Sequence, residues 1–288
     1  MSQEPGFSIQ SVLHPTDFSE GSLVAFHHAL KAAMLAKSKL TLVHVSTDGT
    51  SEWSHFPGVR ETLERWGALP KGSPKSAVGK LGINVLKVMA QKDQPVAAVI
   101  NYLEKNPTDL IVLATSKRDG RIPWLGKSVA EPVTRKAGEM TLLIPGDAEG
   151  FVSSKDGSVN LKRILIPIAR TPRPEPALIA VATLVQKWNC SEGTFVLVHV
   201  GTSKTMPALR LPEVPGWTWE KELRTGEVID GIVKSAQENK ADLIALATDG
   251  RNEFLDAFRG SHSERIMRYG VAPLLTIPID SRVSRSLS

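Results

Sequence analysis

The chain carries, near its C-terminus, a spacing of glycine and serine that suits phosphate binding. Gly250 follows the apolar run DLIAL, and Gly260 and Ser261 come ten residues later. Glycine lets a backbone approach a ligand closely. Ser261 and Glu264 have the spacing of a capping box, so a helix should begin there, and a helix N-terminus favours phosphate. The same residues also fit a purely structural role, in which Gly250 turns the chain and Ser261 caps the helix.

An earlier copy of this loop, at residues 114–128, has lost its glycines. Lys117 and Lys127 stand at the glycine positions, while Ser128 keeps the capping position. The two ammonium groups attract phosphate, but their side chains occupy the space that a close backbone contact requires. We therefore expect the earlier copy to be impaired in phosphate binding. The tripeptide GKS within it is not a P-loop, because that motif needs a glycine where the chain has Arg121.

An aspartate follows the first apolar run, in the sequence PTDFSE. The carboxylate of Asp17 could accept hydrogen bonds from a ribose or a base. Asp17 and Glu20 also have the spacing of a capping box, which would explain the aspartate structurally. In the second half of the chain Ala169 occupies the matching place. That half has therefore lost whatever the carboxylate does.

The sequence contains no motif for a metal site or for a hydrolase. The chain has no paired cysteines, no His-Glu-x-x-His and no Gly-x-Ser-x-Gly element. His44 and His199 lie in LVHV runs and are expected to be core residues or strand-end contacts. His27 and His28 are adjacent on a helix and face different directions, so they make a poor metal pair. The single cysteine, Cys190, excludes an internal disulfide and fits a reducing cytoplasm.

An internal repeat shows which elements must position these residues. The matching segments occur in the same order in both halves: 11–30 with 163–184, LTLVHV (40–45) with FVLVHV (195–200), DLIVLAT (109–115) with DLIALAT (242–248), and TLLIP (141–145) with LLTIP (274–278). The short β-branched runs predict parallel strands buried on both faces. Helical periods separate them, at 23–35, 96–103 and 129–136 in the first half and at 177–188, 228–237 and 264–269 in the second. We expect two tandem doubly wound α/β domains of five strands each.

Composition shifts suggest the domain boundaries. We expect a first domain at 1–147, a linker at 148–160, a second domain at 161–280 and a tail at 281–288. The linker is rich in Gly, Ser and Asp and has no periodicity.

The first domain contains an insert at 46–80 that the second domain lacks. A short helix is expected in it, around Val59 to Trp66. Its aromatic residues Trp53, Phe56 and Trp66 either form a partner surface or fold back on the domain, and we favour the second interpretation.

Composition argues against membranes and nucleic acid as partners. The chain of 288 residues is 41% hydrophobic and 23% charged, as expected of a soluble globular protein. No apolar run approaches a membrane span, and the N-terminus lacks a signal segment, so we expect a cytoplasmic protein. The net charge of +5 is shared by both halves without a basic run, which makes nucleic-acid binding a weak hypothesis.

Several of these motifs resemble a known family. VLHPTDFSEGSLVAFHHAL, LTLVHV, DLIVLAT and SVAEPV resemble a universal stress protein domain, and residues 242–278 resemble a second one. The chain as a whole is similar to a tandem universal stress protein. The resemblance implies an adenine-nucleotide α-hydrolase-like sheet with strand order 3-2-1-4-5. It also implies that TLLIP and LLTIP pair as edge strands in an intramolecular pseudo-dimer. Two such tandem chains could in turn form a homodimer.

The resemblance also implies a set of nucleotide-binding residues. ATP-binding members carry a Gly-x2-Gly-x9-Gly-Ser/Thr loop after strand four for the phosphates, and an Asp after strand one and a Val ending strand two for the adenosine. In the first half the matching residues are Pro15, Thr16, Asp17, Val45, Ala114, Lys117, Lys127 and Ser128. In the second half they are Pro167, Ile168, Ala169, Val200, Ala247, Gly250, Arg251, Gly260, Ser261 and His262.

The two implied sites depart from the family pattern in complementary ways. The first half keeps Asp17 but no glycine, whereas the second keeps Gly250, Gly260 and Ser261 but has Ala247 for the first glycine. Losing one hydrogen bond to ribose costs about 0.5–1.5 kcal/mol, and losing backbone contact with a triphosphate should cost more. We therefore expect ATP, with or without Mg²⁺, in the second half.

Three functions follow from these motifs. The first is a nucleotide-binding stress-response sensor or adaptor. The second is a stress-protein scaffold that binds no nucleotide and acts through protein–protein contacts. The third is a weak ATP hydrolase or autokinase, for which Asp249 and His262 are candidates by position alone.

Overall fold

A computed structural model describes residues 7–46, 52–91, 95–115, 139–145, 148–248 and 271–279, together with Ile266 and Tyr269. The predicted loop positions Lys117, Lys127 and Ser128 lie outside the described residues. So do Asp249, Gly250, Arg251, Gly260, Ser261 and His262, the expected helix at 129–136 and most of the one at 264–269.

The first half of the chain forms five parallel strands. These are β1 (Ser11–Pro15), β2 (Lys39–Ser46), β3 (Asn84–Gln91), β4 (Leu110–Thr115) and β5 (Met140–Pro145). They lie side by side in the order β3-β2-β1-β4-β5. Every residue of β4 and β5 is buried, because helices cover both faces of the sheet.

The second half repeats this arrangement. Its strands are β6 (Arg163–Pro167), β7 (Gly193–Val200), β8 (Trp217–Arg224), β9 (Leu243–Thr248) and β10 (Leu274–Pro278). Their order is β8-β7-β6-β9-β10, so each half has the predicted strand order 3-2-1-4-5.

Two pairs of helices cover the two faces of the sheet. Helices α1 (Glu20–Ala36) and α6 (Glu175–Lys187) pack on one face, and α4 (Pro95–Lys105) and α7 (Val228–Glu238) pack on the other. All four helices were expected at these places from the apolar periodicity. In the described part of the chain, no helix is long and apolar enough to cross a membrane.

The insert of the first domain folds back on that domain. It contains the 3-10 turn η1 (Trp53–His55) and the short helices α2 (Val59–Arg65) and α3 (Ala77–Lys80). Phe56 is buried, and Trp66 packs beside the His27 ring, as the favoured interpretation predicted. Trp53 stacks on Phe56 but remains 58% exposed.

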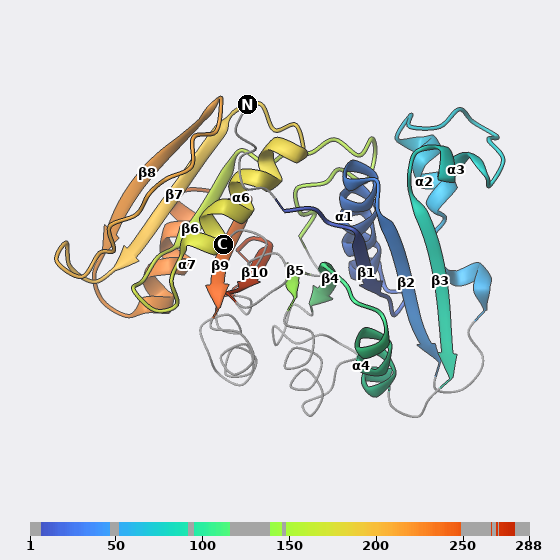
Figure 1. The fold of residues 1–288 in the computed structure, drawn as a ribbon, viewed down its shortest axis with the longest axis horizontal. Coiled ribbons are helices and arrows are strands. Elements are labelled where there is room, and N and C mark those ends of the chain that lie inside the picture. Colours follow the sequence, from blue (N-terminus) through green and yellow to red (C-terminus); the bar gives the residue numbers. More distant parts are fainter. Residues whose placement is uncertain are drawn as a thin grey trace.

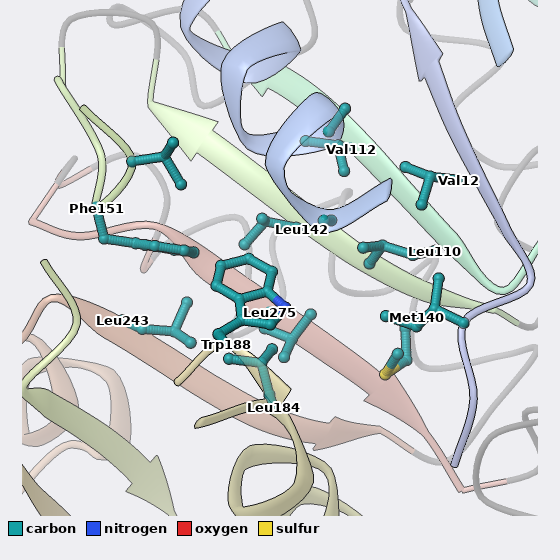
Figure 2. Packing of buried hydrophobic residues seen from close by; sticks show 14 of the residues in the cluster. Val12, Leu110, Val112, Met140, Leu142, Phe151, Leu184, Trp188, Leu243 and Leu275 are labelled. Carbon is teal, nitrogen blue, oxygen red and sulfur yellow. The ribbon is translucent and has the colours of Figure 1, made fainter. Parts of the chain in front are cut away.

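The two halves join through their fifth strands into one ten-stranded sheet (Figure 1). Strands β5 and β10 pair antiparallel, with Leu274 opposite Leu143 and Leu275 opposite Leu142. The predicted intramolecular pseudo-dimer is therefore confirmed. Figure 2 shows that Leu142 and Leu275 lie in the buried cluster that continues from one half into the other.

The segment at 148–160, expected to be a linker, folds as a short hairpin that we call the inter-domain hairpin. Val152 and Val159 form an antiparallel bridge, and the amide N–H of Asn160 donates to the carbonyl of Phe151 at 2.8 Å. Phe151 is buried against Trp188, the residue that ends α6 (Figure 2). A segment without periodicity is thus ordered by tertiary contacts.

The joint between the halves leads to a prediction about stability. Replacing Leu275, which is 1% exposed, by alanine leaves a cavity in the shared core and should lower the free energy of unfolding by about 2–5 kcal/mol. Urea denaturation followed by circular dichroism measures this loss. The matched control is Leu23→Ala, at a position that is 45% exposed, and it should change the stability by less than about 0.5 kcal/mol. Equal losses in the two variants would contradict the assignment of Leu275 to the core.

Candidate functional site

The candidate site lies at the carboxyl ends of the strands, where the strand order reverses between β1 and β4 and between β6 and β9. Ligands bind at such switch points in doubly wound sheets. The ladder between β1 and β4 stops at Leu13 and Ile111, although β1 stays paired with β2 as far as Pro15. The ladder between β6 and β9 stops at the matching place, Leu165 with Ile244. In both halves the central strands therefore end their pairing at the edge where a ligand is expected.

In the first half, a buried histidine occupies the place where this ladder stops. His14 Nδ1 donates to the carbonyl oxygen of Val112 at 2.9 Å, which is the first residue of β4 beyond the last ladder pair. Burial lowers the pKa of His14 to about 4, so its ring is neutral near pH 7. The second half has the apolar Ile166 at the matching position of β6.

Hydrogen bonds continue from this histidine into the loop after β1. His14 Nε2 lies 3.5 Å from the hydroxyl of Ser22, and that hydroxyl donates to Thr16 Oγ1 at 2.9 Å. Thr16 Oγ1 also accepts the amide N–H of Phe18 at 3.1 Å. Phe18 takes a left-handed backbone conformation with φ of 63°, which costs a non-glycine residue roughly 1–2 kcal/mol. Its ring stacks on His44 with centroids 3.9 Å apart, and such contacts offset part of that cost.

Asp17 lies in this loop, but it does not cap the helix, which was one of the two roles that the sequence left open for it. The N-cap of α1 is Ser19, whose side chain accepts the amide N–H of Ser22 at 3.2 Å. Asp17 Oδ1 instead accepts the amide N–H of Ser19 at 3.0 Å and its hydroxyl at 2.6 Å. The alternative of a capping box with Glu20 is therefore wrong, because the turn at Phe18 moves the helix start two residues beyond Asp17. Among the described residues, Asp17 Oδ2 has no hydrogen bond.

The ends of the second strands are tied to the loops by two equivalent histidines. His44 Nδ1 donates to the carbonyl of Thr16 at 2.8 Å, and His199 Nδ1 donates to that of Ile168 at 3.0 Å. The sequence left core residues and strand-end contacts open as alternatives for these histidines, and the structure shows strand-end contacts for both. They hold the next residues, Val45 and Val200, at the ends of β2 and β7, beside the loops that follow β1 and β6.

The loop after β6 keeps the backbone hydrogen bond of the loop after β1, but its side chains carry a different charge. The amide N–H of Ile168 donates to the carbonyl of Val198 at 2.8 Å, as that of Thr16 does to Val43. Ala169 is exposed where the first half has Asp17. Arg170 follows where the first half has Phe18, and its Nη2 donates to a backbone carbonyl at 3.1 Å.

The ends of the fourth strands differ in how their buried threonines are bonded. Thr115 Oγ1 lies 3.5 Å from the carbonyl of Ile144, whereas the buried Thr248 Oγ1 has no partner among the described residues. Ala247, just before it, is paired within β9 and β10 and is not among the residues with positive φ. Alanine in place of the family's glycine is therefore unstrained at this position.

One pair of aspartates with a structural role was not predicted from the sequence. Asp109 Oδ2 accepts the amide N–H groups of Gln10 and Ser11, and Asp242 Oδ2 accepts those of Lys162 and Arg163. Each aspartate joins the starts of two neighbouring strands, on the edge opposite the candidate site. The repeated Asp-Leu at the start of DLIVLAT and DLIALAT was the signal for this pair.

Two other features of the described residues carry no catalytic chemistry. A shallow hollow of about 610 Å³ lies at the amino ends of β6 and β9, away from the candidate site, and Lys162, Arg163 and Asp242 are among its lining residues. Burial raises the pKa of the Cys190 thiol to about 11, so little of it is thiolate near pH 7. No cluster of potential metal ligands occurs in the part of the chain that the structure describes.

Comparison with solved structures supports the fold. A universal stress protein from Archaeoglobus fulgidus DSM 4304 has a TM-score of 0.60 at 17% identity, covering 96% of this chain and 98% of its own. A functionally unknown protein from Pseudomonas aeruginosa PAO1 has a TM-score of 0.57 at 11% identity, and the match covers 97% of this chain and 94% of that protein. The cytoplasmic domain of a prokaryotic cation chloride cotransporter has a TM-score of 0.54 at 12% identity, and the match covers 97% of this chain and 100% of that domain.

Comparison with sequences assigns the family. No curated protein matches this chain at a significant level. The sequence model of the Universal stress protein family, however, matches residues 8–145 and 207–278. The first segment contains β1 to β5, and the second contains β8 to β10. The chain therefore belongs to the universal stress protein family, with two of its domains in tandem.

Proposed function

We propose that the second domain binds an adenine nucleotide, ATP, and that the protein acts in the cytoplasm as a stress-response sensor or adaptor. The observation that carries this proposal is the buried hydroxyl of Thr248, which no described residue satisfies. A buried polar group without a partner costs about 1–3 kcal/mol. A ligand that supplies the missing hydrogen bond recovers this cost, and Thr248 directly precedes the segment that carries Gly250 and Gly260.

Charge also favours the second domain over the first as the phosphate-binding half. The loop after β6 carries the exposed cations Arg170 and Arg173, whereas the loop after β1 carries the anion Asp17. The two guanidinium groups of the loop after β6 attract an anionic triphosphate. In addition, Asp17 already uses one carboxylate oxygen to hold Ser19.

A sensor of this kind works by differential affinity. ATP shifts an equilibrium between two conformations, or between free and partner-bound protein, only by as much as it binds one state better than the other. The backbone loops at Thr16 and Ile168 are held by strand-end histidines in both domains. We propose that the second domain uses this geometry for nucleotide and that the first domain serves as its structural partner.

The first prediction concerns the phosphate loop. Gly260→Glu should abolish ATP binding in titration calorimetry, because a carboxylate would repel phosphate and fill the space of a backbone contact. Lys127→Glu, at the equivalent position of the first domain, is the matched control and should leave the affinity unchanged. Absence of binding by the wild type at millimolar ATP would refute the proposal and support the scaffold function.

The second prediction concerns the missing carboxylate. Ala169→Asp restores an acceptor for the ribose and should tighten ATP binding by up to about tenfold, the effect of one hydrogen bond of 0.5–1.5 kcal/mol. Asp17→Ala in the first domain should not change the affinity. If Asp17→Ala weakens binding and Ala169→Asp has no effect, the site lies in the first domain instead.

The third prediction concerns Thr248. Thr248→Val removes the unsatisfied hydroxyl, so it should weaken ATP binding while raising the thermal stability of the nucleotide-free protein. Thr115→Val at the matching place should change neither the affinity nor the stability by a comparable amount. Affinity that stays at the wild-type value in Thr248→Val would show that this hydroxyl does not contact the nucleotide.

A further inference from the structure

The base of the inter-domain hairpin is attached to the first domain through a buried side chain, that of His28 on α1. His28 Nε2 accepts the amide N–H groups of both Phe151 and Val152, at 3.0 and 3.2 Å. We propose that His28 is an acid-sensitive clasp, whose protonation detaches the inter-domain hairpin and loosens the contact between the two domains.

The protonation state of His28 follows from its hydrogen bonds. Its Nδ1 lies 2.9 Å from the carbonyl oxygen of Val24, and a carbonyl can only accept, so Nδ1 carries the hydrogen. The neutral ring then leaves Nε2 bare to accept from the hairpin. A second proton would have to go onto Nε2, where it would face the amide N–H groups of Phe151 and Val152. Both hydrogen bonds would be lost, and like partial charges would meet.

The packing around His28 leaves no room for the ring to avoid this conflict. His28 is fully buried, and its ring meets Phe151 edge-on with centroids 4.7 Å apart. Gly150, with φ of 68°, passes so close that an added Cβ would lie 2.3 Å from His28 Cε1. Only glycine fits there, because a side chain would clash with the ring and would also be strained by the positive φ.

The clasp connects the two domains and not only two parts of one. Phe151 packs between His28 of α1 and Trp188 of the second domain, with ring centroids 4.7 and 5.4 Å apart. The tip of the inter-domain hairpin is held separately, because Arg65 Nε and Trp66 Nε1 of the insert donate to the carbonyl of Ser154. Release at His28 would therefore free the base of the hairpin while its tip stays attached.

The ionisable groups nearest the clasp come from α1, α2 and the inter-domain hairpin. His27 lies beside it on α1, and Arg65 from α2 is 3.1 Å from His27 Nε2. Lys31 lies one turn further along α1, where Asp156 of the hairpin acts on it. Trp188, from the end of α6, brings no charge. Burial, together with neighbouring His27, lowers the pKa of His28 from 6.5 to about 4.

The direction of the pH effect follows from this depressed pKa. Detachment exposes His28 and returns its pKa toward 6.5, so the detached state binds a proton more readily than the docked state. Docking is therefore at full strength above pH 6.5 and weakens as the pH falls from 6.5 toward 4. In that window the equilibrium constant for detachment rises by about tenfold per pH unit.

Hydrogen–deuterium exchange of the nucleotide-free protein tests the proposal. Protection of amides in residues 148–160, corrected for intrinsic exchange, should fall by about tenfold or more between pH 7 and pH 5, while β5 and β10 stay protected. His28→Gln supplies an acceptor oxygen that does not titrate, so the hairpin should stay docked and lose its pH dependence. Gly150→Ala should leave the hairpin unprotected at both pH values.

A neighbouring histidine provides the matched control. His27 is also buried, with a pKa lowered to about 4, but among the described residues it contacts Arg65 and nearby rings and not the inter-domain hairpin. His27→Gln should therefore keep the wild-type pH dependence of hairpin protection. The proposal is overturned if His28→Gln responds to pH as the wild type does, or if hairpin protection changes only together with that of the sheet.

Discussion

The antiparallel ladder between β5 and β10 is the constraint on which the rest of the structure depends. In each half the fifth strand is fully buried, which is possible only because the other half covers its edge. An apolar strand with an open edge would associate with other chains. By pairing with each other, the two strands convert two marginal sheets into one and place the second domain in a fixed position relative to the first. The inter-domain hairpin can link the two domains only because this joint brings Trp188 close to α1, so that Phe151 contacts both Trp188 and His28.

Histidine rings that contact a backbone carbonyl provide the second recurring interaction in this protein. In His14, His28, His44 and His199, Nδ1 contacts a backbone carbonyl at 2.8–3.0 Å. Three of the four rings hold the loops or strand ends of the candidate site, and the fourth holds the hairpin. A neutral imidazole can bridge a carbonyl on one side and a donor on the other. This makes it suitable for places where a ladder ends and backbone groups would otherwise lack partners.

The candidate site shows where prediction from sequence succeeds and where it stops. His44 and His199 could be placed at strand ends because the LVHV runs define the strands and their register. The role of Asp17 could not be assigned, because its spacing to Glu20 fits a capping box while the cap that forms is Ser19. Local spacing does not reveal that Phe18 takes a positive φ, since that conformation is supported by the stacked ring of His44 from another strand.

The sequence by itself determined the number of strands, because apolar runs of repeated length report burial directly. The strand order and the pairing of the two halves were predicted from the resemblance to the family. The sequence also determined which half kept Asp17 and which kept Gly260, since these are residue identities. Only the tertiary structure decided that Ala247 is unstrained, that Thr248 lacks a partner among the described residues and that residues 148–160 are packed. These properties depend on backbone angles and on contacts between residues far apart in the chain, and neither leaves a periodic trace in the sequence.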